Sequence, residues 1–191
     1  MKTKLLFPVA LIGLLFLASC QHATTTTNCI NTFPYLANGH TLHYSITDAF
    51  LFSDTSFDVS IGITSSSDVY MSTGVSDQGS LNQTGYFHPC NDKLYLGNTV
   101  SAAQSSGNYE RVNNVPVNTT WSETVSGTTY NYAVIGKNIS VTVPAGTFVC
   151  DKVTYHEAGT INTDTIYCNA AVGDVKYDGT LFSYELHHKN F

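Results

Sequence analysis

Apolar and polar side chains alternate along most of this chain, with the period of two that is typical of half-buried β-strands. Every second position is apolar in residues 57–63, and the pattern recurs in residues 138–143. Less regular segments rich in Thr, Val and Tyr predict further strands at residues 42–46, 68–73, 86–88, 94–96, 121–125, 129–135, 148–155, 164–169, 176–177 and 181–186. Short helical turns are expected at most near residues 32–36 and 99–104. The pattern therefore predicts a mainly β protein.

The first twenty residues have the three-part organisation of a bacterial lipoprotein signal. Lys2 and Lys4 form a basic start, and an apolar run follows at residues 5–17. That run is too short for a transmembrane helix, which needs roughly 20 residues, and it fits a secretory leader instead. The closing Leu17-Ala18-Ser19-Cys20 resembles the lipobox, in which peptidase cleaves before the cysteine and the thiol carries a diacylglyceryl group.

These features predict the organisation and the location of the chain. We expect a signal peptide at residues 1–19, a lipidated cysteine and polar tether at residues 20–28, and one β-rich domain at residues 29–191. Gln21 in place of Asp after the lipidated Cys20 resembles the outer-membrane default of enteric bacteria. Membrane lipid, held through acyl chains on Cys20, is thus the first expected partner in the cell envelope.

The net charge of the mature chain argues against some classes of binding partner. Without Lys2 and Lys4, six basic and fourteen acidic side chains remain, a formal net charge of −8. An acidic surface argues against binding of nucleic acid and against electrostatic adhesion to anionic headgroups. The acidic residues are scattered singly along the chain, which is typical of ordinary solvated positions.

Four cysteines follow Cys20, and an even number in an exported chain favours disulfides. Residues 148–155 and 164–169 predict a hairpin that turns about Gly159. In that register Cys150 lies opposite Cys168, at a separation that a disulfide accepts. We therefore predict a Cys150–Cys168 disulfide, and by elimination a Cys29–Cys90 disulfide.

The second half of the chain carries a family resemblance. Its motifs are V-P-A-G-T-F at residues 143–148 and V-G-D-V-K at residues 172–176, within a matching order over residues 115–186. They resemble an uncharacterised family of bacterial exported proteins, similar in fold to the half-barrel of the LolA/LolB lipoprotein carriers. The resemblance implies a single curved antiparallel sheet, either a half-barrel or an open barrel. Pro144 and Gly146 suit a tight turn, and Gly173 suits a bend.

A search for reactive groups finds no recognisable catalytic centre. His40 and His43 would suit a metal on a helix, but on a strand they face opposite sides, and the neighbours His187 and His188 also diverge. His156-Glu157 lacks the second histidine of a zinc-protease motif, because Thr160 stands in its place. Neither a metal nor another cofactor is predicted.

Two functional classes remain, and an enzyme is a distant third. The first is a binding module that holds an apolar small molecule, such as an acyl chain, on the concave face of a curved sheet. The second is a structural or interaction lipoprotein of the outer membrane, with another envelope protein as its partner. An open apolar cavity would favour the first class, and a filled interior the second.

Overall fold

The computed structural model describes residues 29–49, 53–107, 109–125 and 127–191. The predicted signal peptide, Cys20 and the tether lie outside these residues and stay predictions.

Twelve antiparallel strands form a single sheet in the described part of the chain. They are β1 (Thr41–Ala49), β2 (Ser56–Ile63), β3 (Tyr70–Ser76), β4 (Gln83–Cys90), β5 (Lys93–Gly97), β6 (Tyr109–Val112), β7 (Thr120–Val125), β8 (Thr128–Val143), β9 (Gly146–Glu157), β10 (Asp164–Asn169), β11 (Gly173–Asp178) and β12 (Phe182–Lys189). Their order is β6-β5-β4-β3-β2-β1-β12-β11-β10-β9-β8-β7, so two meanders meet where β1 pairs with β12.

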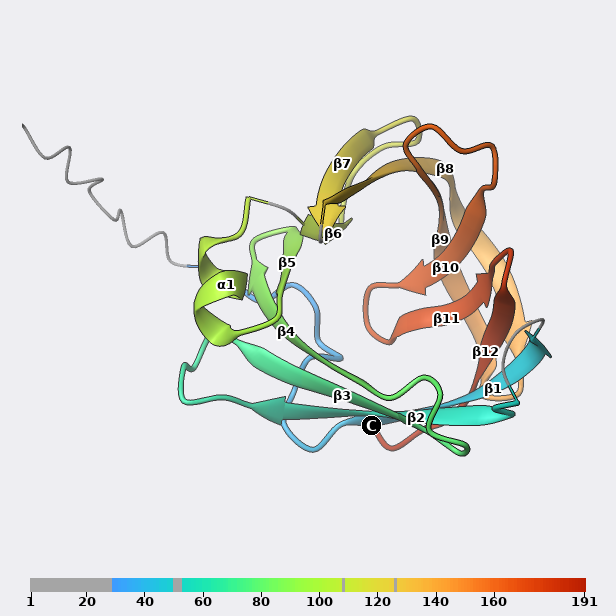
Figure 1. Ribbon diagram of the computed structural model, residues 1–191, viewed down its shortest axis with the longest axis horizontal. Coiled ribbons are helices and arrows are strands. Elements are labelled where there is room, and N and C mark those ends of the chain that lie inside the picture. The colour runs from blue at the N-terminus through green and yellow to red at the C-terminus, as the bar shows by residue number, and fades with distance from the viewer. Residues whose placement is uncertain (1–28, 50–52, 108, 126) are drawn as a thin grey trace, which may run out of the picture.

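The sheet curls into a nearly closed barrel, and Figure 1 shows its strands arranged as a ring. The two edge strands, β6 and β7, lie beside each other, with the rings of Tyr109 and Trp121 stacked 6.3 Å apart across the seam. The prediction of a mainly β, curved antiparallel sheet is confirmed. The expected turn glycines also adopt left-handed backbone angles, with φ of 131° at Gly146 and 90° at Gly173.

One short helix, α1 (Val100–Ser105), packs on β4 and β5. It begins after Thr99, whose hydroxyl accepts a hydrogen bond from the Ala102 amide at 3.1 Å, as an N-cap does. No helix within the described ranges has the length and apolar character that crossing a membrane requires.

The segment before β1 contributes to the core. Phe33 is fully buried and Leu36 is 2% exposed, both packed with Ile61 of β2 and Leu94 of β5. A larger cluster joins β1, β8, β9, β11 and β12, and a third surrounds Trp121. Burial of these apolar side chains is the main force that closes the sheet.

The predicted Cys150–Cys168 disulfide was wrong, and both residues are free thiols. In the β9–β10 hairpin, Cys168 lies opposite Asp151, one residue from the predicted register. Successive side chains on a strand point to opposite faces, so this shift separates the two thiols. Cys150 is buried in the cluster around Leu186, whereas Cys168 packs against the cluster around Trp121.

Candidate functional site

The interior of the barrel holds a cavity of about 740 Å³. This volume lies within the range of roughly 300–1,000 Å³ that is usual for small-molecule sites. Alternation on the strands directs apolar side chains inward. Much of the wall is aliphatic, contributed by Leu36, Leu42, Val59, Ile61, Leu94, Leu96, Val125 and Ile166.

A continuous row of aromatic rings crosses the inner wall. Its members, here called the aromatic row, are Phe57, Tyr44, Tyr184, Tyr177, Tyr155, Tyr132 and Trp121. They come from β2, β1, β12, β11, β9, β8 and β7 in turn, and neighbouring ring centroids lie 4.8 to 6.4 Å apart. Such spacing is favourable for stacked and edge-on pairs. All of these rings except that of Trp121 line the cavity.

A buried ion pair lies at the wall of the cavity. The Arg111 guanidinium on β6 pairs with the Asp174 carboxylate on β11 and donates a 3.3 Å hydrogen bond to the Tyr35 hydroxyl. The Tyr184 hydroxyl donates to the second Asp174 oxygen at 3.2 Å, and the Tyr44 hydroxyl to its backbone carbonyl at 3.0 Å. Arg111 is only 7% exposed, so its charge is balanced by Asp174 before any ligand arrives.

Glu110 enters the cavity because of a β-bulge. Leu94 pairs with Arg111 and Tyr95 with Tyr109, so Glu110 is an extra residue on β6. A bulge re-aims a side chain that simple alternation would turn away. Glu110 therefore lines the cavity together with its neighbour Arg111. Burial raises the pKa of its carboxyl to about 7, against the opposing effect of Arg111.

A second carboxyl, Glu123 of β7, lies across the seam and is 4% exposed. It accepts a short hydrogen bond from the Tyr132 hydroxyl through Oε1, while Oε2 is buried without a hydrogen-bond partner. Burial raises the pKa of this carboxyl, which the Tyr132 hydrogen bond partly offsets. An unpaired buried oxygen is costly, so a donor from a ligand would be favoured here.

Glu110 and Glu123 also line a second cavity, which adjoins the first. A space of about 460 Å³ lies toward α1 and is lined by Gly97, Ala102 and Ser106 among others. Glu110, Glu123 and Val125 line both cavities, so the two meet at the seam between β6 and β7. The site therefore combines apolar and aromatic walls with two acids where the two cavities meet.

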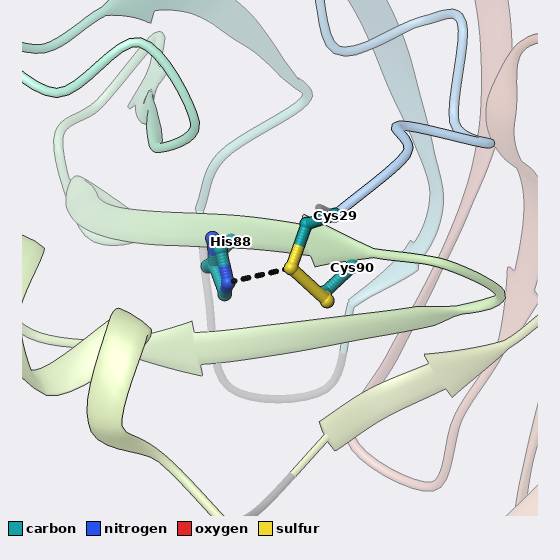
Figure 2. Close-up of side chains that lie close together, drawn as sticks. All are labelled: Cys29, His88 and Cys90. Atoms are coloured by element: carbon teal, nitrogen blue, oxygen red, sulfur yellow. Dashed lines mark hydrogen bonds between the residues drawn. A yellow bond between two sulfur atoms is a disulfide. The ribbon is translucent and has the colours of Figure 1, made fainter. Parts of the chain in front are cut away.

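The second predicted disulfide, Cys29–Cys90, is confirmed. Figure 2 shows it with the His88 ring directed at Cys29, at 3.6 Å between Nε2 and Sγ. His88 also lies 3.0 Å from the Asp68 carbonyl through Nδ1 and is 8% exposed. Because both sulfurs are bonded to each other, this group is not a metal site in its oxidised form.

The predicted histidines have mixed outcomes. His156 lies on β9 and not on the helix that a zinc-protease motif would require. His40 stacks on Phe191 with ring centroids 4.1 Å apart, away from any histidine group in the described residues. The prediction that His187 and His188 diverge was wrong, because both gather around His43.

Sequence reasoning missed the polar lining of the cavity. Glu123 had a detectable signal, since it lies two residues after Trp121 and so shares its inward face. Glu110 was missed because no strand is predicted at residues 109–112, and the bulge on β6 breaks the alternation there as well. Arg111 and Asp174 have a sequence separation of 63 and meet only through the closure of the barrel.

Comparisons with known proteins identify the fold. No family model matches the chain, and no curated protein matches it. A solved protein of Bacteroides fragilis, described as exported and as having a YmcC-like fold, is 14% identical with a TM-score of 0.54, and the match covers 85% of this chain and 100% of that one. A protein of Parabacteroides distasonis described as a lipoprotein is 14% identical with a TM-score of 0.49, over 85% and 99% of the two chains. The predicted similarity to LolA/LolB stays a prediction, and the fold of this chain is similar to the YmcC-like fold.

Proposed function

We propose that this protein is a lipid-anchored binding protein of the bacterial cell envelope, whose barrel holds an apolar or amphiphilic small molecule. The observation that carries the proposal is the 740 Å³ cavity, with its aromatic row and aliphatic walls. The motif Leu17-Ala18-Ser19-Cys20 supports the lipid anchor, and Gln21 supports the outer membrane.

The charged side chains that line the cavity indicate which polar group the ligand carries. Asp174, Glu110 and Glu123 offer three carboxyls to the cavity, and Arg111 is the guanidinium that opposes them. Since Arg111 is already paired with Asp174, it has no free charge to offer a ligand carboxylate, which would instead lie beside the carboxyls of Glu110 and Glu123. A hydroxyl or an amine can instead donate to the free Oε2 of Glu123. The ligand is therefore an apolar molecule with a neutral or cationic donor group.

Three probes of equal chain length test this chemistry: dodecylamine, dodecanol and dodecanoic acid. Trp121 is the single tryptophan, and its ring lies 5.1 Å from that of Tyr132 on the cavity wall. Its fluorescence should therefore change on binding. We expect the amine to bind most tightly and the acid least. Native mass spectrometry of the gently purified protein should also reveal any ligand that it carries from the cell.

A matched pair of variants locates the binding. Ser72 lines both cavities, so Ser72→Phe should narrow the space where they meet and weaken binding of the amine at least tenfold. Ser60 is exposed on the outer face of β2, and Ser60→Phe should bind as the unchanged protein does. Failure of all three probes, with no ligand carried from the cell, would contradict the proposal and favour the interaction role.

The anchor needs its own test, because it is independent of the cavity. Cells that express the protein are grown with labelled palmitate, and we expect label in the protein and fractionation with the outer membrane. Cys20→Ala should lose both the label and the membrane association. A Cys20→Ala variant that stays bound to membrane would contradict lipid anchoring at this residue.

A further inference from the structure

A group of three histidines lies on the outer face of the barrel, apart from the cavity. His43 alternates on β1 with the buried Leu42 and Tyr44, so its side chain points outward. His187 and His188 on β12 are exposed beside it. One ligand atom from each histidine lies within 4.8 Å of those of the other two.

A β-bulge explains why neighbours on one strand share a face. His43 pairs with His188, but Tyr44 pairs with Leu186, so His187 is an extra residue on β12. Two consecutive residues then oppose His43, and the bulge turns both toward it. The His43 ring lies 4.8 Å from that of His188 and 5.5 Å from that of His187.

A carboxylate orients the central histidine. Asp58 of β2 is the register partner of His43, and its Oδ1 lies 2.7 Å from the His43 Nδ1. With the proton on Nδ1, His43 donates to Asp58, and its Nε2 keeps a free lone pair. Histidines that bind metals are commonly held by such a carboxylate, which fixes the tautomer and makes the imidazole a stronger ligand.

We propose that His43, His187 and His188 bind one divalent ion of the zinc or copper class, with Asp58 as the residue that orients His43. Imidazole nitrogens prefer such ions to calcium or magnesium, which take oxygen ligands. Nitrogens on one tetrahedral zinc ion are about 3.3 Å apart, because each Zn–N bond is about 2.0–2.1 Å. The ligand atoms of the three histidines lie within 4.8 Å of one another, and rotation of the exposed His187 and His188 side chains can bring them to the distance that zinc requires. Three protein ligands leave a fourth position open to water.

Metal titration of the full chain tests the site. The protein is purified without a polyhistidine tag and with its disulfide intact, so that neither a tag nor the two bonded cysteines compete for zinc. Calorimetry with zinc should show one ion per chain. Copper bound to the same chain should give an electron paramagnetic resonance spectrum with splitting from three nitrogens.

Variants assign the ligands. His43→Gln and His187→Gln should each weaken zinc binding at least tenfold, and Asp58→Asn by about ten- to a hundredfold. His156→Gln, a histidine on β9 outside the group, should bind zinc as the unchanged protein does. His187 is exposed, so its variant keeps the test valid if the His43 variant proves unstable. No zinc binding by the unchanged protein, or unchanged binding in both the His43 and His187 variants, would overturn the proposal.

Discussion

Individual side chains decide the electrostatics of this barrel, and Glu110 is the clearest example. Its side chain is carried inward by a bulge and is 27% exposed beside Arg111. The ordinary pKa of 4.5 rises to about 7 in the folded protein because burial disfavours the charge. Between these values the folded chain holds a proton that the unfolded chain has lost. The free energy of unfolding must therefore decrease as the pH rises through this window.

Replacement of Glu110 tests whether the free energy of unfolding decreases with pH for this reason. Glu110→Gln removes the penalty of ionisation, so the variant should gain up to about 3 kcal/mol at pH 8 and much less at pH 5. Urea unfolding at the two pH values measures the difference. Glu157→Gln, at the exposed end of β9, is the control and should change little at either pH. An equal gain for Glu110→Gln at both values would contradict the assignment.

The free thiols give a second prediction at this scale. Burial raises the pKa of Cys150 to about 12 and that of Cys168 to about 11. The reactive thiolate is therefore scarce at pH 8, and neither residue should react with iodoacetamide in the folded protein. After unfolding without a reductant, peptide mapping should find both alkylated, with Cys29 and Cys90 still linked. A peptide that joins Cys150 to Cys168 would contradict the observed register.

At the scale of elements, single extra residues in strands position both candidate sites. The bulge on β6 turns Glu110 into the cavity, and the bulge on β12 gathers His187 and His188 beside His43. A bulge leaves the strand in the sheet but breaks the period of two. The sequence pattern predicts a strand at residues 181–186, which overlaps β12, but none at β6, and it misplaces the side chains of His187 and His188.

The packing of α1 on the sheet depends on a glycine. A Cβ at Gly97 of β5 would lie 2.3 Å from the Ala103 amide nitrogen and 2.7 Å from the Ala102 carbonyl carbon. The helix would have to move, so Gly97→Ala should lower the free energy of unfolding by about 1–3 kcal/mol. Gly107→Ala, where a Cβ meets nothing within 4 Å, is the control and should have little effect. Equal thermal stability of the two variants would contradict this contact.

At the scale of the whole molecule, the segment before β1 links the barrel to the predicted anchor. Cys29 is joined to Cys90 of β4, and Tyr35 and Leu36 from the same segment line the cavity. The disulfide thus holds a part of the cavity wall and closes a loop with a sequence separation of 61 residues. A cross-link of this length restricts the unfolded chain and stabilises the fold by about 4 kcal/mol.

Loss of this disulfide should therefore lower the stability of the whole domain. Cys29→Ser with Cys90→Ser should unfold at a lower urea concentration, with a difference near that estimate, and residues 33–36 should exchange amide hydrogens faster. Hydrogen exchange followed by mass spectrometry measures the second effect. Residues 147–154 of β9, far along the chain, serve as the internal reference. Unchanged exchange at residues 33–36 would show that burial of Phe33 alone holds the segment.

The sequence by itself determined the fold class of this protein, whereas it yielded the Cys29–Cys90 disulfide only by elimination, from a Cys150–Cys168 pairing that was wrong. Alternation and composition predict strands because each strand carries its own period, and the turn residues Pro144, Gly146 and Gly173 carry their own backbone preferences. These are local properties, so they can be predicted from a short segment without knowledge of the rest of the chain. The leader and Cys20 also depend only on a short run of residues, and they stay predictions.

Only the tertiary structure decided the register of β9 and β10, the polar lining of the cavity and the gathering of the histidines. Cys168 pairs with Asp151 and not with Cys150, a difference of one residue in register. No local sequence pattern distinguishes two registers that differ by a single residue. Arg111 meets Asp174, and His43 meets His188, through strands distant in sequence. Such contacts depend on how the whole sheet closes, because the curvature and the bulges set which side chains converge.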